Sequence, residues 1–155
     1  MRSARAYQYL ANFSSNELRG PLRSIDAIDK GNQYRWQITW AITGRWSEID
    51  PESLFAYSLS AEDANLKKNC VPLAIQALAK RDRARAHALV NTIEDTNLRR
   101  DAALQIIRAT AEDDPKAALT ALTSEAGNPR EYDRLFTSWG AGAPQEACCA
   151  FKRLS

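Results

Sequence analysis

The sequence predicts an all-α fold built from helical hairpins that repeat along the chain. Three observations lead to this prediction: apolar residues recur at three- and four-residue steps, strand-like alternation is missing, and the sequence matches itself at a shift of 32 residues. A chain of 155 residues with 45% apolar and 26% charged residues can fold as one unit. We therefore expect a single domain over residues 1–155.

The repeat is clearest when residues 66–97 are laid over residues 98–126. This places Leu66 over Leu98, Ala74 over Ile106 and Asp82 over Asp114. A further shift gives a third clear unit, and a weaker copy lies on either side. The sequence therefore predicts five units, with approximate ranges of 2–33, 34–65, 66–97, 98–126 and 127–155.

Each unit is expected to hold two helices joined by a short hinge. Asp50-Pro51 and Asp114-Pro115 mark this hinge, because aspartate is a good N-cap and proline is tolerated at the first helical position. In the first unit Leu18-Arg19 stands at the hinge position. Pro72 falls in the middle of a first helix, which predicts a late start or a kink there. Five hairpins give about ten helices.

An isolated hairpin cannot bury its apolar stripe, so the hairpins are expected to stack into an α-solenoid with one continuous core. The segment ALQIIRATAEDDPKAAL, from Ala103 to Leu119, resembles the short helix-turn-helix repeats with an Asp-Pro hinge of bacterial tetratricopeptide-like and HEAT-like proteins. The resemblance extends over the chain and is best over residues 34–126. It implies a right-handed α-α superhelix and a role in binding other proteins.

The bulk properties argue against several classes of protein. The formal charge of +2 is small for a dedicated nucleic-acid binder, and the sequence has neither a long apolar run nor a secretory signal. Cys70, Cys148 and Cys149 cannot form a conventional disulfide framework, which favours a reducing compartment, and together with His87 they lack the paired spacing of a zinc site. We expect a cytoplasmic protein without a membrane span, metal or cofactor.

The sequence contains no convincing catalytic motif. His87 is the only histidine, and its repeat equivalents Phe55 and Leu119 predict a buried, hydrogen-bonded side chain more than a general base. Cys148 and Cys149 are expected to be half-buried on the last helix, with no histidine near them in sequence. The acidic run Glu112–Asp114 is interpreted as an N-cap and its neighbours. No phosphate loop or nucleophile elbow is present, so we expect no enzymatic activity.

Two of the three tryptophans in the stretch YRWQITWAITGRW are expected to pack inside the protein. Trp46 aligns with Leu78, Thr110 and Trp139, which predicts a partly buried packing role. Trp40 aligns with Pro72 and Leu104, which predicts a position in the core or between repeats.

Trp36 is different, because it aligns with Lys68 and Arg100 and is therefore expected on the surface. An exposed indole beside a charged residue has the composition of an interaction hot spot. The alternative is that the first repeat, with Tyr7 and Tyr9, covers it.

Positive charge gathers at equivalent positions of the first helices and would form a basic ladder across the stack. Such a ladder suits an acidic peptide or a partner helix. The alternative is an ordinary solvated face that Glu94, Asp95 and Asp101 neutralise. With Trp36 as an apolar anchor, the candidate partner-binding residues are Arg35, Trp36, Lys67, Lys68, Arg99, Arg100 and Arg108.

These residues predict a scaffold or adaptor that binds another protein. A second hypothesis is a structural subunit or a piece of a longer solenoid that associates with itself, because Phe151–Ser155 follows without a polar capping helix. A third is binding to nucleic-acid backbone, for which the cluster Lys80–Arg85 is a further candidate, although that cluster also reads as a hydrated turn.

Overall fold

The computed structural model of the protein describes residues 12–25, 33–124 and 128–154. Within these ranges the protein is all-helical and contains no strand, as the periodicity of the apolar residues predicted. The helices in the described ranges are α2 (Ser15–Ile25), α3 (Gln33–Ile49), α4 (Pro51–Ser60), α5 (Ala64–Ala79), α6 (Arg83–Val90), α7 (Thr96–Asp113), α8 (Pro115–Ser124), α9 (Pro129–Gly142) and α10 (Pro144–Leu154).

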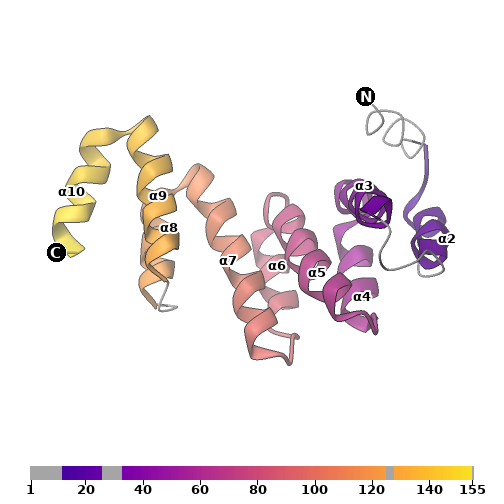
Figure 1. Ribbon diagram of the computed structural model, residues 1–155. Helices are drawn as coiled ribbons and strands as arrows, with labels where there is room; N and C mark the ends of the chain where they lie inside the picture. The colour runs from indigo at the N-terminus through magenta and orange to yellow at the C-terminus, as the bar shows by residue number, and fades with distance from the viewer. Residues whose placement is uncertain (1–11, 26–32, 125–127, 155) are drawn as a thin grey trace.

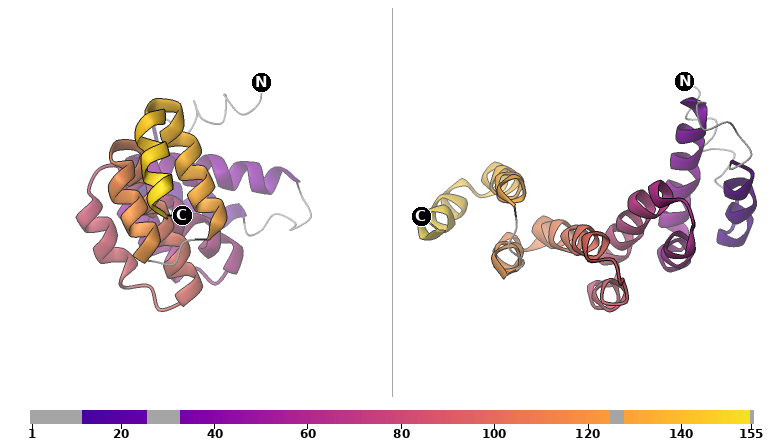
Figure 2. Two further views of the ribbon diagram at one scale, coloured as in Figure 1. Left: turned by 90° about the vertical axis from the view of Figure 1, so that its left-hand side faces the viewer. Right: turned by 60° about the horizontal axis from the view of Figure 1, so that its bottom comes forward.

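The helices follow one another along the molecule in chain order, from α2 at one end to α10 at the other (Figure 1). From α3 onward they pair into hairpins, and the hinges of these hairpins lie along one edge, the upper one in Figure 1. Helices α3, α5, α7 and α9 form one layer, here called the A layer, and α4, α6 and α8 form the B layer (Figure 2, right). Each A-layer helix contacts the next one.

Aspartate N-caps start most of these helices and recur with the repeat period. Asp50, Asp82 and Asp114, which are 32 residues apart, each accept a hydrogen bond of 2.9–3.0 Å from the backbone N–H three residues on and so begin the B-layer helices. Asp63 and Asp95, again 32 apart, cap α5 and α7. The predicted Asp-Pro caps are confirmed, and the additional caps show that the repeat dictates where both helices of a hairpin begin.

Two expectations about helix starts are wrong. Leu18-Arg19 lies inside α2 and not at a hinge, because the helix begins at Ser15 and the Ser14 carbonyl already accepts a hydrogen bond from the Leu18 backbone N–H. The carboxylate of Glu17 accepts hydrogen bonds from the Ser14 backbone N–H (2.8 Å) and hydroxyl (2.6 Å). Of the two outcomes predicted for Pro72, a late start is not observed: α5 begins at Ala64, where Asp63 caps it, and Pro72 lies inside the helix. The part of the first unit before residue 12 lies outside the described residues.

The buried apolar side chains form two clusters that meet on α7, and not the one continuous core that was expected. Leu98, Ala102 and Ile106 of α7 belong to the larger cluster, which reaches back to α2. Ile107 turns to the other side and packs with residues of α8 and α9. Since α7 buries two opposite faces, it joins the last two hairpins to the rest of the molecule.

Candidate partner-binding site

The cations beside the hinges are paired with carboxylates of neighbouring hairpins. Lys80 Nζ lies 3.0 Å from Glu112 Oε1, across a separation of 32 residues. Arg83 contacts the carboxylate of Asp113. The acidic run Glu112–Asp114 therefore supplies two inter-hairpin ion pairs and one N-cap. Further along the chain, Lys116 of α8 pairs with Glu146 of α10 at 2.9 Å.

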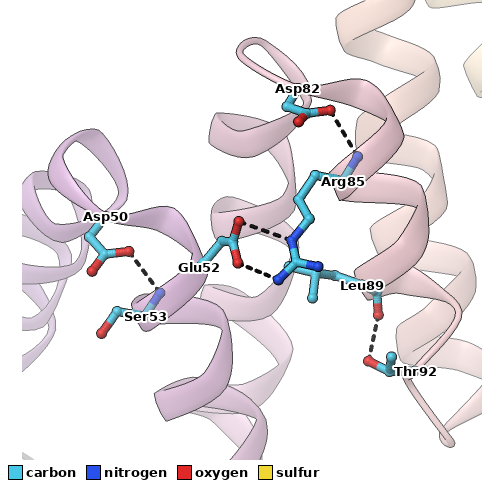
Figure 3. A network of polar contacts seen from close by, with 7 residues as sticks. All are labelled: Asp50, Glu52, Ser53, Asp82, Arg85, Leu89 and Thr92. Carbon is cyan, nitrogen blue, oxygen red and sulfur yellow. Dashed lines mark hydrogen bonds and ion pairs between the residues drawn. The ribbon is translucent and has the colours of Figure 1, made fainter.

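Arg85 and Glu52 form a two-point link between consecutive B-layer helices (Figure 3). Arg85 Nε donates to Glu52 Oε1 at 3.0 Å, and Nη2 donates to Oε2 at 2.7 Å. The hydrogen bonds from Arg85 hold the pKa of Glu52 below its usual range. The N-caps Asp50 and Asp82 in the same view place the starts of both helices. The cluster Lys80–Arg85 thus forms ion pairs with carboxylates of the protein itself.

The candidate cations of the A layer divide into two groups. Arg35 lies 3.7 Å from Asp63, and Arg108 is hydrogen-bonded to Glu131 of α9. These two side chains are engaged in contacts within the protein. The other four form no ion pair with any residue that the structure describes, and they are Lys67, Lys68, Arg99 and Arg100.

Trp36 and Trp40 form an exposed aromatic pair on α3. Each is 50% exposed, and their ring centroids lie 6.2 Å apart at an interplanar angle of 36°. The surface position predicted for Trp36 is confirmed. The core position predicted for Trp40 is wrong. Pro72 and Leu104 are half-buried at the equivalent positions. Because the indole of Trp40 is larger than these side chains, much of its surface stays in solvent at such a position. The tyrosines proposed to cover Trp36 lie outside the described residues.

Trp46, in contrast, is fully buried, which goes beyond the partly buried packing role that was predicted. It packs against Tyr57 at a centroid distance of 5.2 Å, and the guanidinium of Arg19 lies 5.9 Å from its ring centroid. The three tryptophans of one helix therefore have two environments. Two are available at the surface, and one holds α3 to its neighbours.

The A layer carries an apolar track with cations beside it. Repeat-equivalent positions place Trp40, Pro72 and Leu104 on α3, α5 and α7. The positions four residues earlier hold Trp36, Lys68 and Arg100, all exposed. Positions four apart are neighbours on a helix surface, so on each of these three helices the exposed residue lies beside the apolar one.

A shallow hollow on α9 was not foreseen from the sequence. It has a volume of about 470 Å³ and is lined by Arg130, Asp133, Arg134, Thr137 and Ser138. The spacing of Arg130 and Arg134 was the only signal in the sequence, since residues four apart share a helix face. Neither arginine forms an ion pair with any residue within the described ranges.

The structure does not bring the candidate catalytic and metal-binding residues together. His87 is exposed on α6, and the expectation that it is buried is wrong, because this short helix buries Ala86 and Val90 and turns residue 87 away. Cys148 and Cys149 are exposed and not half-buried, since the described structure packs only α9 against α10 as a main contact. Within the described ranges no group of three or more histidine, cysteine, aspartate or glutamate side chains could hold a metal ion.

The helices of the described ranges include none that is long and apolar enough to cross a membrane.

No protein-family model matches the chain, and comparison with curated proteins and with solved structures finds no significant match.

Proposed function

We propose that this protein is a non-enzymatic α-solenoid scaffold of the reducing cytoplasm that binds an acidic peptide or partner helix across its A layer. The contrast between its two sets of cations supports the proposal. Those at the hinges form inter-hairpin ion pairs, while Lys68 and Arg100 have no carboxylate partner in the described chain and stand four residues before the half-buried apolar residues Pro72 and Leu104.

The two exposed indoles supply the apolar part of the contact. Large aromatic side chains carry a disproportionate share of binding energy at protein interfaces. Trp36 and Trp40 expose half of their surface at one end of the track, and Ile38 of the same helix is 40% exposed. A partner with an apolar anchor and acidic residues would therefore match both the shape and the charge of this face.

Affinity enrichment from lysate followed by direct binding of the purified partner tests the proposal. We expect the Lys68→Glu, Arg100→Glu double variant and the Trp36→Ala variant to lose a partner that the wild type retains. A matched control, Lys80→Glu with Lys116→Glu, makes the same change in net charge at the hinge edge and should retain it. Equal loss in the control, or loss in neither variant, would refute binding through the A layer.

Self-association is a second candidate, favoured by one observation at the other end of the molecule. Phe151 of α10 is 59% exposed and meets Phe136 of α9 edge-on, with centroids 5.5 Å apart. Light scattering coupled to size exclusion should then show an oligomer that grows with concentration and is weakened by Phe151→Ser. A monomer at all concentrations would remove this candidate.

A further inference from the structure

The terminal hairpin, formed by α9 and α10, lies at one end of the molecule and meets α7 and α8 through a small apolar contact (Figure 1). Leu135 is the one buried side chain that α9 adds to the second apolar cluster of the described residues, and α10 adds none. The cluster also holds Ile107 of α7 and Leu122 of α8. By comparison, α7 adds a larger set of buried side chains to the first cluster, namely Leu98, Ala102, Ile106 and Ala109. The surface between the terminal hairpin and α7–α8, here called the terminal junction, is therefore the smaller one.

The terminal hairpin also has packing of its own. Phe136 stacks on Trp139 within α9 at a centroid distance of 6.0 Å, and Phe151 of α10 meets Phe136 edge-on at 5.5 Å. Trp139 and Ala147 are buried but belong to neither of the two apolar clusters in the described part of the chain. Contacts between α9 and α10 do not depend on α7 or α8, so the two helices can leave the terminal junction as one unit.

Two ion pairs complete the terminal junction. Arg108 of α7 donates to Glu131 of α9 at 3.1 and 2.6 Å, and Lys116 Nζ of α8 lies 2.9 Å from Glu146 of α10. In both pairs the cation is on the α7–α8 side and the carboxylate is on the hairpin. The hairpin therefore presents a leucine and two carboxylates, while α7–α8 presents an apolar surface and two cations.

Every copy of the chain carries both of these surfaces, and they already fit each other in the monomer. Another protein would have to reproduce the leucine and both carboxylates to occupy the same place. The terminal hairpin is joined to α8 only by the chain from Ser124 to Asn128, so an exchange between copies requires a change at one point along the chain. A second copy is therefore the partner whose chemistry matches the terminal junction.

We propose that the terminal hairpin of one copy docks on the α7–α8 surface of a second copy, and that reciprocal exchange forms a closed dimer. Leu135 of each copy then lies in the second apolar cluster of the other, and both ion pairs form between copies. Because the exchanged contacts repeat those of the monomer, the protein concentration sets the dimer fraction. The exchange does not depend on partner binding through the A layer. It gives self-association an interface other than the exposed ring of Phe151.

Charge reversal in two separate variants tests the exchange. In Arg108→Glu two carboxylates face each other across the terminal junction, and in Glu131→Arg two guanidinium groups do, so neither chain holds its own hairpin well. In an exchanged dimer with one copy of each variant, opposite charges face each other at both junctions. Native mass spectrometry of an equimolar mixture should show this mixed dimer about tenfold in excess over either same-variant dimer. Wild type refolded at high concentration should also give dimers.

A second pair of variants makes the same test at a site where unfolding is not a concern. The side chains of Lys116 and Glu146 are both more than half exposed, so Lys116→Glu and Glu146→Lys leave the core intact, and their mixture should also form the mixed dimer. The matched control is Lys80→Glu mixed with Glu112→Lys. These two residues pair across α5 and α7 and stay in one copy during the exchange, so this mixture should give no excess of mixed dimer. Circular dichroism checks that all variants fold.

The outcomes separate the exchange from the other proposals. Monomers in every mixture, or wild type that refolds only to monomer at all concentrations, would overturn it. An equal excess of mixed dimer in the Lys80 and Glu112 control would overturn it too, because general charge attraction would then explain the dimers. Dimers without preference for the mixed form that disappear with Phe151→Ser would place the interface on the exposed face of α10 instead. These variants leave Trp36, Lys68 and Arg100 unchanged, so failure of the exchange leaves binding through the A layer to its own test.

Discussion

Arg108 of α7 donates two hydrogen bonds to the carboxylate of Glu131 on α9, from Nε at 3.1 Å and from Nη2 at 2.6 Å. Glu131 is 11% exposed, which makes this pair more buried than the hinge ion pairs. It joins α7, where the two apolar clusters meet, to the last hairpin. Arg108 therefore has a structural role within the protein, even though its repeat position made it a candidate for partner binding.

Replacing Arg108 with alanine should destabilise the protein by about 1–2 kcal/mol, because Glu131 would keep its charge in a largely buried place without its partner. The cost stays below that of a fully buried pair because the Arg108 side chain is 33% exposed. Urea unfolding measures the loss, and hydrogen exchange should localise it to α9 and α10. An Arg108→Gln, Glu131→Gln double variant, which leaves no buried charge, should recover part of it. Unchanged exchange in α9 would contradict this assignment.

The same pair predicts a dependence of stability on pH. The hydrogen bonds from Arg108 lower the pKa of Glu131 from its ordinary value of 4.5. A lowered folded-state pKa contributes stability that is present above 4.5 and is lost as the pH falls through the folded-state value. Wild type should therefore lose more unfolding free energy than Glu131→Gln between about pH 6 and pH 3. Parallel losses in the two proteins would show that this pair does not contribute.

The tryptophans of α3 should differ in their effect on stability. Trp46→Ala removes a fully buried ring and should cost about 3–5 kcal/mol, as large-to-small changes in a core do. Trp36→Ala and Trp40→Ala each remove a half-exposed ring and should cost about 1 kcal/mol or less. Chemical denaturation of the three variants measures the difference. If Trp36→Ala is as damaging as Trp46→Ala, Trp36 is part of the core.

The N-cap of α6 should matter because this helix is only 8 residues long. Asp82 accepts a hydrogen bond of 2.9 Å from the Arg85 backbone N–H. Asp82→Ala should lower the unfolding free energy by about 1 kcal/mol, and Asp82→Asn, which keeps a capping oxygen, should recover most of it. Thermal or urea unfolding distinguishes the two. Equal loss in both variants would mean that charge, and not capping, is responsible.

The cysteines should react at different rates. Burial raises the pKa of Cys70 to about 11, whereas Cys148 and Cys149 are exposed. Because the thiolate is the reactive form, a thiol reagent at neutral pH should modify the two exposed cysteines quickly and Cys70 only on unfolding. Mass spectrometry of partly labelled protein reads this directly. Rapid labelling of Cys70 in folded protein would contradict its position in the core.

The repeat pattern identified the hinges at Asp50-Pro51 and Asp114-Pro115, although not the start of α2, because those two hinges depend on local chemistry. Asp50 and Asp114 each cap the helix that follows them in sequence. The apolar residues on either side recur at helical spacing. Repeat equivalence was less reliable for burial. Phe55 is buried and His87 is exposed at equivalent positions, because the length and packing of the helix differ between hairpins.

The sequence by itself determined the helical class, the period of 32 residues and the positions of the Asp-Pro caps, since these follow from neighbouring residues. Only the tertiary structure decided which charges are paired. Lys80 and Arg85 find carboxylates one repeat away in the chain, while Lys68 and Arg100 find none in the described part. It also decided that Trp40 is exposed. Pairing and exposure depend on which neighbouring helix faces a side chain, and that geometry is set by packing between hairpins.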